Sequence, residues 1–344
     1  MKLQIKKTTN LFGEIKVSGS KNASLPILVV TLLTNETDYL QNVPNILDVE
    51  YMIELLKLCG VRVKRNEQTN EVVLKRRKVK SVIKSPYLNQ IRASYYLMGA
   101  LFTEKRTIKT KIPGGCDFEK RPIDYHLDAF KQMGAIIKII NNEIIIKGVK
   151  KLTGTTHKII PDRIEAGSYI CLAAGAEKSN ILIKDLNIEH LKTVINTFKQ
   201  AGLNILYEER NLRIIKNKKL DNLKIIADDY PLFPTDLQQL MVSTLLSSNN
   251  ISIVKDNIYS NRYSEVFELL SMNATLYLKN QTLLIFPSNL IGKEVYANDL
   301  RAGFSLIIAA ISAEGKTIIN HAEVISRGYE NLIDKLRGIN IDIT

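Results

Sequence analysis

One pattern recurs along the whole chain: a helix, a glycine or asparagine, and then a two-stranded hairpin. The hairpins follow LLKLCG, FKQMG, FKQAG and LLSMN, and LRGINIDIT closes the chain as a fifth unit. The glycine, or its asparagine equivalent, falls at positions 60, 134, 202, 273 and 338, which gives a spacing of 65 to 74 residues. Glycine at a helix end predicts a left-handed cap, and the alternating apolar residues after it predict half-buried strands. The chain is therefore expected to be built from five equivalent repeats of α/β structure.

A second helix of small and apolar residues recurs in each repeat. The five apolar stretches are ILVVTLL, YYLMGALF, YICLAAGA, LQQLMVSTLL and FSLIIAAISA. Helices that are apolar on nearly every side are buried, so we expect them inside a ring of other elements. A polar or charged residue opens each one, and helix N-termini attract anions. Several such starts that converge on one place would form a phosphate or carboxylate site.

Length and charge narrow the class of protein. A chain of 344 residues predicts two domains. The net charge is +13, but the lysines are spread along the chain without interleaved aromatic platforms, so a nucleic-acid partner is not favoured. The N-terminus has no apolar signal core, and the early apolar run at 25–33 is too short to span a bilayer. We expect a soluble cytoplasmic protein with no membrane partner.

Cysteine and histidine usage argues against metal and disulfide sites. The three cysteines, Cys59, Cys116 and Cys171, are widely spaced and odd in number, so they predict no disulfide framework. The four histidines are scattered and form no ligand cluster. No metal and no redox cofactor is expected.

The loop PGGCDFEKRP at 113–122 is the most distinctive short segment. Its two glycines allow a sharp turn and a close approach to a ligand. Lys120 and Arg121 favour the thiolate of Cys116, whereas Asp117 opposes it. These residues fit either a reactive cysteine or a surface loop that happens to carry one.

Charged residues open several of the apolar helices or lie near their starts. Cations dominate, and two carboxylates accompany them. Lysine and arginine that hold an anionic substrate, with an aspartate as base and a cysteine as acid or nucleophile, form a coherent site. The candidates are Lys21, Asn22, Arg92, Cys116, Arg121, Asp236, Asp299, Arg301 and Arg327.

At this point the sequence resembles the enolpyruvyl transferases, from one end to the other and in the family's order. Within that family it is similar to the branch that acts on UDP-N-acetylglucosamine, because the sister branch, which acts on shikimate 3-phosphate, lacks the PGGC loop. The matching segments are SGSKNASLP (18–26), IRAS (91–94), PGGC (113–116), RPIDYH (121–126), PDRIEAG (161–167), FPTD (233–236), NRY (261–263), DLRAG (299–303) and SRGYE (326–330).

The resemblance implies an α/β fold, a pair of inside-out α/β barrels built from βαβαββ-like repeats. The first domain would span 21–160, and the second would combine 1–20 with 161–344. The active site would lie in the cleft between them. The implied reaction moves the enolpyruvyl group of phosphoenolpyruvate to the 3-hydroxyl of UDP-N-acetylglucosamine and releases phosphate, with no cofactor.

The resemblance also implies a role for each candidate residue. Lys21 would bind phosphoenolpyruvate, Cys116 would protonate the enol carbon or form an adduct, and Asp236 would deprotonate the sugar hydroxyl. The remaining residues would contact the substrates: Asn22 the sugar, the arginines the charges of phosphoenolpyruvate, and 121–125 with Ile258 the uridine and diphosphate. This substrate-binding set is Asn22, Arg92, Arg121, Pro122, Ile123, Asp124, Tyr125, His126, Ile258, Asp299, Arg301 and Arg327.

Two departures from the family pattern stand out. The family has six repeats, three in each domain, whereas this chain passes from EIIIKGVKKLTG directly to HKIIPDRIEAG, so the third repeat is missing. The two remaining repeats would close around the gap, a partner chain, such as a second copy, would cover it, or the protein would be only marginally stable. In addition, Asp117 to Lys120 replace an apolar residue and a glycine after Cys116, and Ser260 stands where the family often has glutamate. A ligand-binding relative without turnover, or activity on shikimate 3-phosphate, are the alternatives.

Overall fold

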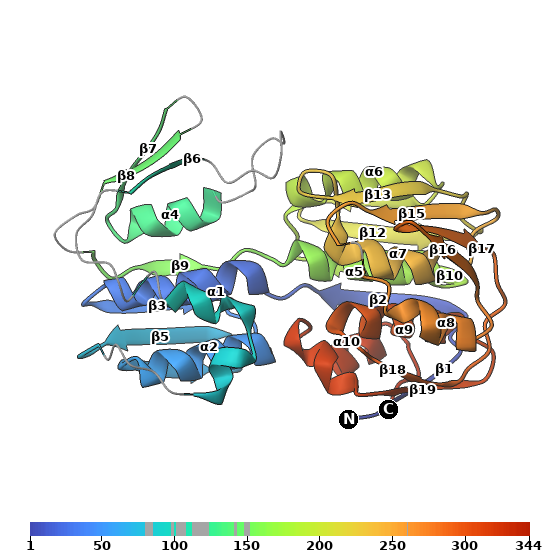
Figure 1. The fold of residues 1–344 in the computed structure, drawn as a ribbon, viewed down its shortest axis with the longest axis horizontal. Helices are drawn as coiled ribbons and strands as arrows, with labels where there is room; N and C mark the ends of the chain where they lie inside the picture. The colour runs from blue at the N-terminus through green and yellow to red at the C-terminus, as the bar shows by residue number, and fades with distance from the viewer. Residues whose placement is uncertain are drawn as a thin grey trace. The chain divides into compact units, whose positions relative to one another are not determined.

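The computed structural model describes residues 1–79, 85–97, 100, 108–111, 124–140, 143–147, 152–259 and 261–344. These residues form two compact units, and each has its own hydrophobic core (Figure 1). The large unit comprises Met1–Val17 and Arg163–Thr344, and the small unit comprises Ser18–Asp162. The small unit is therefore a continuous segment, inserted after the first strands of the large unit.

Three sheets form the outer layer of the large unit. The first has the order β1-β19-β18, the second β11-β12-β10-β2, and the third β14-β13-β15-β17-β16. Their strands are β1 (Leu3–Lys6), β2 (Asn10–Lys16), β10 (Lys178–Lys184), β11 (Asn204–Glu208), β12 (Asn211–Lys216), β13 (Lys224–Asp228), β14 (Phe233–Pro234), β15 (Ser252–Asp256), β16 (Thr275–Lys279), β17 (Thr282–Phe286), β18 (Glu294–Tyr296) and β19 (Lys316–Asn320).

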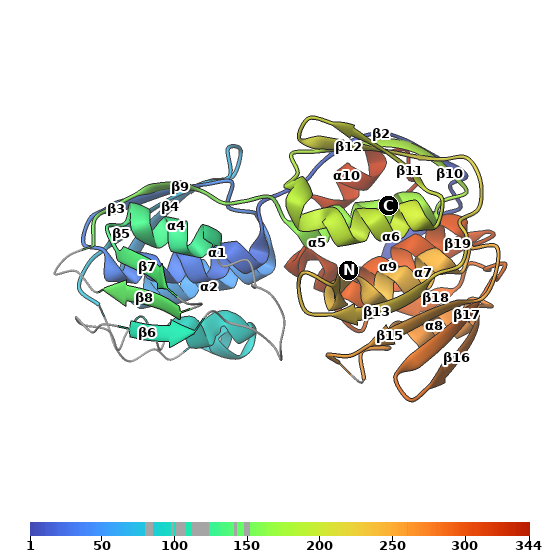
Figure 2. The same cartoon turned by 90° about the horizontal axis from the view of Figure 1, so that it is seen from above.

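Three helices fill the interior of the large unit: α5 (Arg163–Gly175), α7 (Gln238–Leu245) and α9 (Leu300–Ser312). Each of them packs on the other two (Figure 2). All eight residues of α7 are buried, and only Arg163 of α5 is not. The prediction that the small-residue helices are buried all round is thus confirmed for these three. Three further helices lie farther out, namely α6 (Lys192–Gln200), α8 (Glu265–Ser271) and α10 (Leu332–Arg337).

The small unit has two sheets among its described residues, with the orders β4-β5-β3-β9 and β6-β8-β7. Helix α1 packs against both α2 and α4. The elements are α1 (Lys21–Val30), β3 (Thr37–Gln41), α2 (Leu47–Leu58), β4 (Val61–Asn66), β5 (Glu71–Arg76), β6 (Ile108–Lys111), α4 (Asp124–Gln132), β7 (Ile136–Ile140), β8 (Glu143–Lys147) and β9 (Thr156–Lys158).

The strand pairing shows the repeat directly. The predicted hairpins are antiparallel pairs, β4 with β5, β7 with β8, β11 with β12 and β16 with β17. The fifth repeat is completed by the other end of the chain, because β1 pairs with β19 and Ile5 bridges Ile343. Four of the five sheets contain a parallel strand pair; in the described residues, the β6-β8-β7 sheet has only antiparallel pairs.

The left-handed caps follow the prediction at four of five positions. Gly60, Gly134, Gly202 and Asn273 have φ values of 95°, 94°, 81° and 71°. The prediction is wrong at Gly338, which has φ −61° and ψ −16°. Its amide donates to Asp334, and the helical turn continues until Asn340 takes the left-handed conformation, with φ 70°.

In the part of the chain that the structure describes, every helix is too short or too polar to cross a membrane.

Candidate active site

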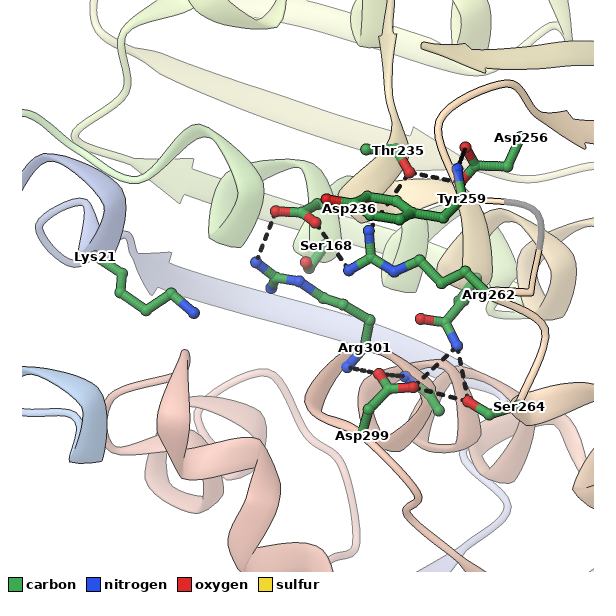
Figure 3. Close-up of polar contacts among 12 residues, drawn as sticks. Lys21, Ser168, Thr235, Asp236, Asp256, Tyr259, Arg262, Ser264, Asp299 and Arg301 are labelled. Atoms are coloured by element: carbon green, nitrogen blue, oxygen red, sulfur yellow. Dashed lines mark hydrogen bonds and ion pairs between the residues drawn. The ribbon is translucent and has the colours of Figure 1, made fainter. Parts of the chain in front are cut away.

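The large unit holds one carboxylate between two guanidinium groups (Figure 3). Asp236 Oδ1 lies 2.8 Å from Arg262 Nη2, and Asp236 Oδ2 lies 3.4 Å from Arg301 Nη2. The Arg301 side chain is 5% exposed, whereas that of Asp236 is 29% exposed. The two guanidinium groups thus hold the Asp236 carboxylate at a position that is partly open to a ligand.

The turn between β14 and α7 positions Asp236. This residue lies in the short 3₁₀ helix Thr235–Leu237, so its backbone is fixed between a strand end and a buried helix. The Thr235 hydroxyl donates a hydrogen bond to Asp256, the last residue of β15. Neighbouring strands therefore hold the turn from both sides.

The loop after β15 positions Arg262. Asp256 Oδ1 accepts hydrogen bonds from the amides of Ile258 at 2.8 Å and Tyr259 at 2.9 Å, so the loop begins wound around this carboxylate. The Arg262 guanidinium then lies 5.2 Å from the centre of the Tyr259 ring. A cation over an aromatic face is attracted by the ring, and this contact aims Arg262 at Asp236.

Asp299 is the N-cap of α9. Its Oδ1 accepts from the amides of Arg301 and Ala302 at 2.8 and 2.9 Å, and its Oδ2 accepts from Ser264 Oγ at 2.7 Å and Gln239 Nε2 at 3.3 Å. Burial opposes ionisation, but these hydrogen bonds together hold the pKa of Asp299 below its ordinary value. Asp299 thus fixes the start of the helix that carries Arg301, and its predicted contact with substrate stays a prediction.

A second carboxyl group lies behind this cap. Glu265 at the start of α8 is fully buried, and burial raises its pKa to about 7 although Gln239 Nε2 donates to it at 2.8 Å. Gln239 therefore joins two carboxyl groups with opposite pKa shifts. Sequence reasoning did not single out Glu265 or Gln239, because their importance lies in contacts between different repeats.

Lys21 opens α1 in the small unit. Its amide donates to Asp162 Oδ2 at 3.0 Å, and its Nζ lies 3.3 Å from Asp48 Oδ2. The Lys21 side chain is 15% exposed and that of Asp48 is 7% exposed, so the ammonium group is largely enclosed by protein. The backbone here is tight, because a Cβ on Gly19 would lie 1.8 Å from the carbonyl oxygen of Asn42. This close approach accounts for the glycine directly before the helix cap Ser20.

The remaining predicted residues that the structure describes lie in separate elements. Asn22 is exposed in the first turn of α1, Ile258 is 37% exposed, and Arg327 ends the 3₁₀ helix Ala322–Arg327. Arg92 begins the 3₁₀ helix Arg92–Tyr95. Asp124, Tyr125 and His126 form the first turn of α4.

The predicted cysteine loop lies outside the described residues, which include neither Cys116, Arg121, Pro122 nor Ile123. The roles predicted for these residues stay predictions.

Arg262 is the opposite case, because the structure shows a contact that the sequence did not predict. Its segment NRY carried part of the family resemblance, but no role followed from the sequence, and the structure brings its guanidinium to Asp236. In the ranges that the structure describes, no group of three or more acidic, histidine or cysteine side chains could hold a metal ion.

Comparison with known proteins identifies similar sequences along the whole chain. The family described as EPSP synthase (3-phosphoshikimate 1-carboxyvinyltransferase) matches residues 5–145 and 138–336. A UDP-N-acetylglucosamine 1-carboxyvinyltransferase of Halothermothrix orenii is 32% identical over 99% of both chains. Enzymes of the same name are 34% identical in Streptococcus pneumoniae, over 97% of this chain and 96% of the relative, and 31% identical in Orientia tsutsugamushi, over 96% of both.

Solved structures confirm the predicted fold. The enolpyruvyl transferase NikO from Streptomyces tendae is similar with a TM-score of 0.87 and 16% identity, covering 100% of this chain and 98% of that one. EPSP synthase from Acinetobacter baumannii has a TM-score of 0.73 and 14% identity, covering 100% and 99%.

The alignment lengths bear on the missing repeat. The alignment with the Halothermothrix relative runs over 412 positions, and this chain has 344 residues, so at least 68 positions of the relative have no counterpart here. That deficit is the length of one repeat. The two segments of this chain that the family matches overlap at 138–145. These positions fall within the hairpin of β7 and β8, after which the third repeat is predicted to be missing.

Proposed function

Because the chain belongs to the EPSP synthase (3-phosphoshikimate 1-carboxyvinyltransferase) family of enolpyruvyl transferases, we propose that it transfers the enolpyruvyl group of phosphoenolpyruvate to the 3-hydroxyl of UDP-N-acetylglucosamine. The names of its relatives, at 32% and 34% identity, support this acceptor over shikimate 3-phosphate, since the EPSP synthase of known structure is only 14% identical. The observation that carries the proposal is the Asp236 carboxylate between Arg262 and Arg301.

This arrangement suits both steps of an addition–elimination reaction. In the addition, the sugar oxygen forms a bond to C2 of phosphoenolpyruvate, its proton passes to Asp236, and C3 receives a proton from an acid, the role proposed for Cys116. In the elimination, the C2–O bond to phosphate breaks and C3 loses a proton. Both steps carry phosphate and carboxylate charges, which fixed arginine and lysine side chains stabilise without reorganisation.

The two guanidinium groups also hold the Asp236 carboxylate in place, which positions it as a base. Lys21 and the predicted Arg92, Arg121 and Arg327 would add cations for the phosphate. We further propose that the product enters peptidoglycan synthesis in the cytoplasm, and thereby serves cell shape and division.

The test is phosphate release by the purified protein from phosphoenolpyruvate and UDP-N-acetylglucosamine. We expect turnover with this acceptor and at least 100-fold less with shikimate 3-phosphate. A folded protein that binds UDP-N-acetylglucosamine by calorimetry without phosphate release would contradict catalysis and support a binding protein. Faster release with shikimate 3-phosphate would contradict the acceptor.

A further inference from the structure

Arg301 makes a second polar contact, away from Asp236. Its Nη1 lies 3.0 Å from the hydroxyl of Tyr329, in the segment that follows the 3₁₀ helix Ala322–Arg327. The Tyr329 hydroxyl lies 2.7 Å from Ser168 Oγ on α5, and Ser168 Oγ donates to the carbonyl of Ile164 at 2.7 Å. Arg301, Tyr329 and Ser168 are 4%, 2% and 0% exposed. This buried chain runs from the guanidinium group to the first turns of another helix.

One assignment of the hydrogens satisfies all three contacts of this chain. An arginine only donates, so the Tyr329 oxygen accepts from it. When the Ser168 hydroxyl donates to the Ile164 carbonyl, its oxygen accepts the hydrogen of Tyr329. Linked hydroxyl groups of this kind help to hold one another in place.

The ring of Tyr329 is fixed as well. It stacks on Phe304 with 4.4 Å between ring centres and 20° between planes. Phe304 lies three residues after Arg301 on α9, and the Arg301 guanidinium lies 5.5 Å from the centre of the Tyr329 ring. The hydroxyl thus meets Arg301 at a position that packing determines, and the Nη2 atom is left directed at Asp236.

We propose that Tyr329 and Ser168 are positioning residues for Arg301, which set its guanidinium against Asp236 and against the anionic substrate. Neither acts on the substrate itself. Three central helices are linked in this way, since Ser168 is on α5, Arg301 is on α9, and Asp236 directly precedes α7. The link to substrate rests on the proposed function, whereas the link between Tyr329 and Arg301 does not.

The first test is Tyr329→Phe, which keeps the ring and removes the hydroxyl. We expect KM for phosphoenolpyruvate to rise about 10-fold, with less than a 2-fold change in KM for UDP-N-acetylglucosamine. A general loss of packing would instead change the KM values for both substrates together.

Ser168→Ala tests the chain independently and removes only a small group. We expect about a 3-fold rise in KM for phosphoenolpyruvate, and no further rise when it is added to Tyr329→Phe, because the two changes break one chain. Multiplying effects in the double variant would overturn the proposal.

Tyr169→Phe is the matched control. Tyr169 is also buried beside Phe304, at 6.0 Å between ring centres, but its hydroxyl donates to Glu165. We expect the KM for phosphoenolpyruvate to stay within 2-fold of the unaltered protein. An equal rise in Tyr169→Phe and Tyr329→Phe would attribute the effect to general packing and overturn the positioning role.

A measurement without turnover separates this inference from the proposed function. In protein with ¹⁵N-labelled arginine, assigned with Arg301→Lys, a fixed Arg301 should give separate Nη signals that merge in Tyr329→Phe. Separate signals in that variant would overturn the positioning role even if the enzyme is active. Merged signals would support it even if the protein releases no phosphate.

Discussion

The two units use the same repeat but close it differently. In the large unit, α5, α7 and α9 pack on one another, and residues at or beside their starts contact groups from other repeats. In the small unit, the described start of α1 is held by Ser20, Asp48 and Asp162, all within or beside one sheet and its helices. The three repeats of the large unit thus link their helix starts to one another, whereas the ammonium group of Lys21 contacts Asp48 of its own repeat.

This difference between the units determines where the protein can hold a charged side chain in a fixed position. Asp236, Arg262 and Arg301 come from three separate segments. The turn with Asp236 and the Arg301 side chain are held by contacts with further segments, and Arg262 contacts Tyr259 in its own loop. The ammonium group of Lys21 contacts the buried carboxylate of Asp48. A domain can therefore lose a repeat and keep a cation that is braced locally, while a base held between repeats requires the complete threefold unit.

Asp236→Asn tests the large unit most directly. The amide cannot accept the sugar proton, so we expect kcat to fall by about 10³ to 10⁴. Phosphate release measures this, with far-ultraviolet circular dichroism to show that the protein is folded. Asp342→Asn is the control, because Asp342 pairs only at the surface with Lys6. Near-normal turnover in Asp236→Asn would show that Asp236 is not the base.

Lys21→Met is the corresponding change in the small unit. Removing a cation from the phosphoenolpyruvate site should lower kcat/KM for that substrate by about 10². Lys57→Met, on the same unit but paired with exposed Glu54, should leave it unchanged. If both variants have normal kinetics, Lys21 supplies no charge to the reaction, and the contrast between its local contact and the contacts between repeats in the large unit has no bearing on catalysis.

Each unit contains a buried carboxylic acid with a raised pKa, which allows the pH dependence of the stability of the two units to be compared. Burial raises the pKa of Glu265 in the large unit from 4.5 to about 7, and that of Asp38 in the small unit from 3.8 to about 6. The stability that the protonated groups contribute is present below the lower value and is lost as pH rises through the higher one. Glu265→Gln and Asp38→Asn should therefore stabilise the chain at pH 8 by on the order of 2 to 3 kcal/mol.

Thermal unfolding at pH 8 and pH 4 measures both variants, and the gain should vanish at the lower pH. If the units unfold separately, each substitution should move one transition only. A gain of the same size at pH 4 would show that burial does not raise the pKa of the replaced acid.

Asp48→Asn should have the smallest effect. It removes the partner of Lys21 but leaves the ammonium group in place, so we expect about a 10-fold rise in KM for phosphoenolpyruvate with kcat within 3-fold. Initial rates at varied phosphoenolpyruvate measure this. Lower KM in Asp48→Asn would mean that the carboxylate competes with the substrate for Lys21 instead of positioning it.

The sequence predicted what repeats along the chain. Periodic glycine, alternating strands and apolar helices depend on neighbours within about 20 residues, so the hairpins and buried helices could be read directly. Gly338 broke the pattern because the strand that completes its repeat, β1, lies at the far end of the chain. A prediction that uses only neighbouring residues in the sequence does not include that partner strand.

The candidate site was predictable only in part. Asp236 and Arg301 could be named from FPTD and DLRAG, but their pairing joins residues 65 positions apart. The contact of Ser168 with Tyr329 spans 161 positions, and Glu265 gains its raised pKa from burial by other repeats. Such contacts form when the repeats pack against one another, and the order of residues in a single sequence does not show which of them meet.

The placement of the first strands in the large unit has a consequence for biosynthesis. Ser18–Asp162 leaves the ribosome as one uninterrupted stretch and can collapse as soon as it emerges. Strands β1 and β2 leave first, yet β2 pairs with β10 and β1 pairs with β19, about 170 and 310 residues later. Until β10 and β19 have been made, the eleven residues of these two strands lack the partners that they have in the folded unit, which exposes their edges to aggregation.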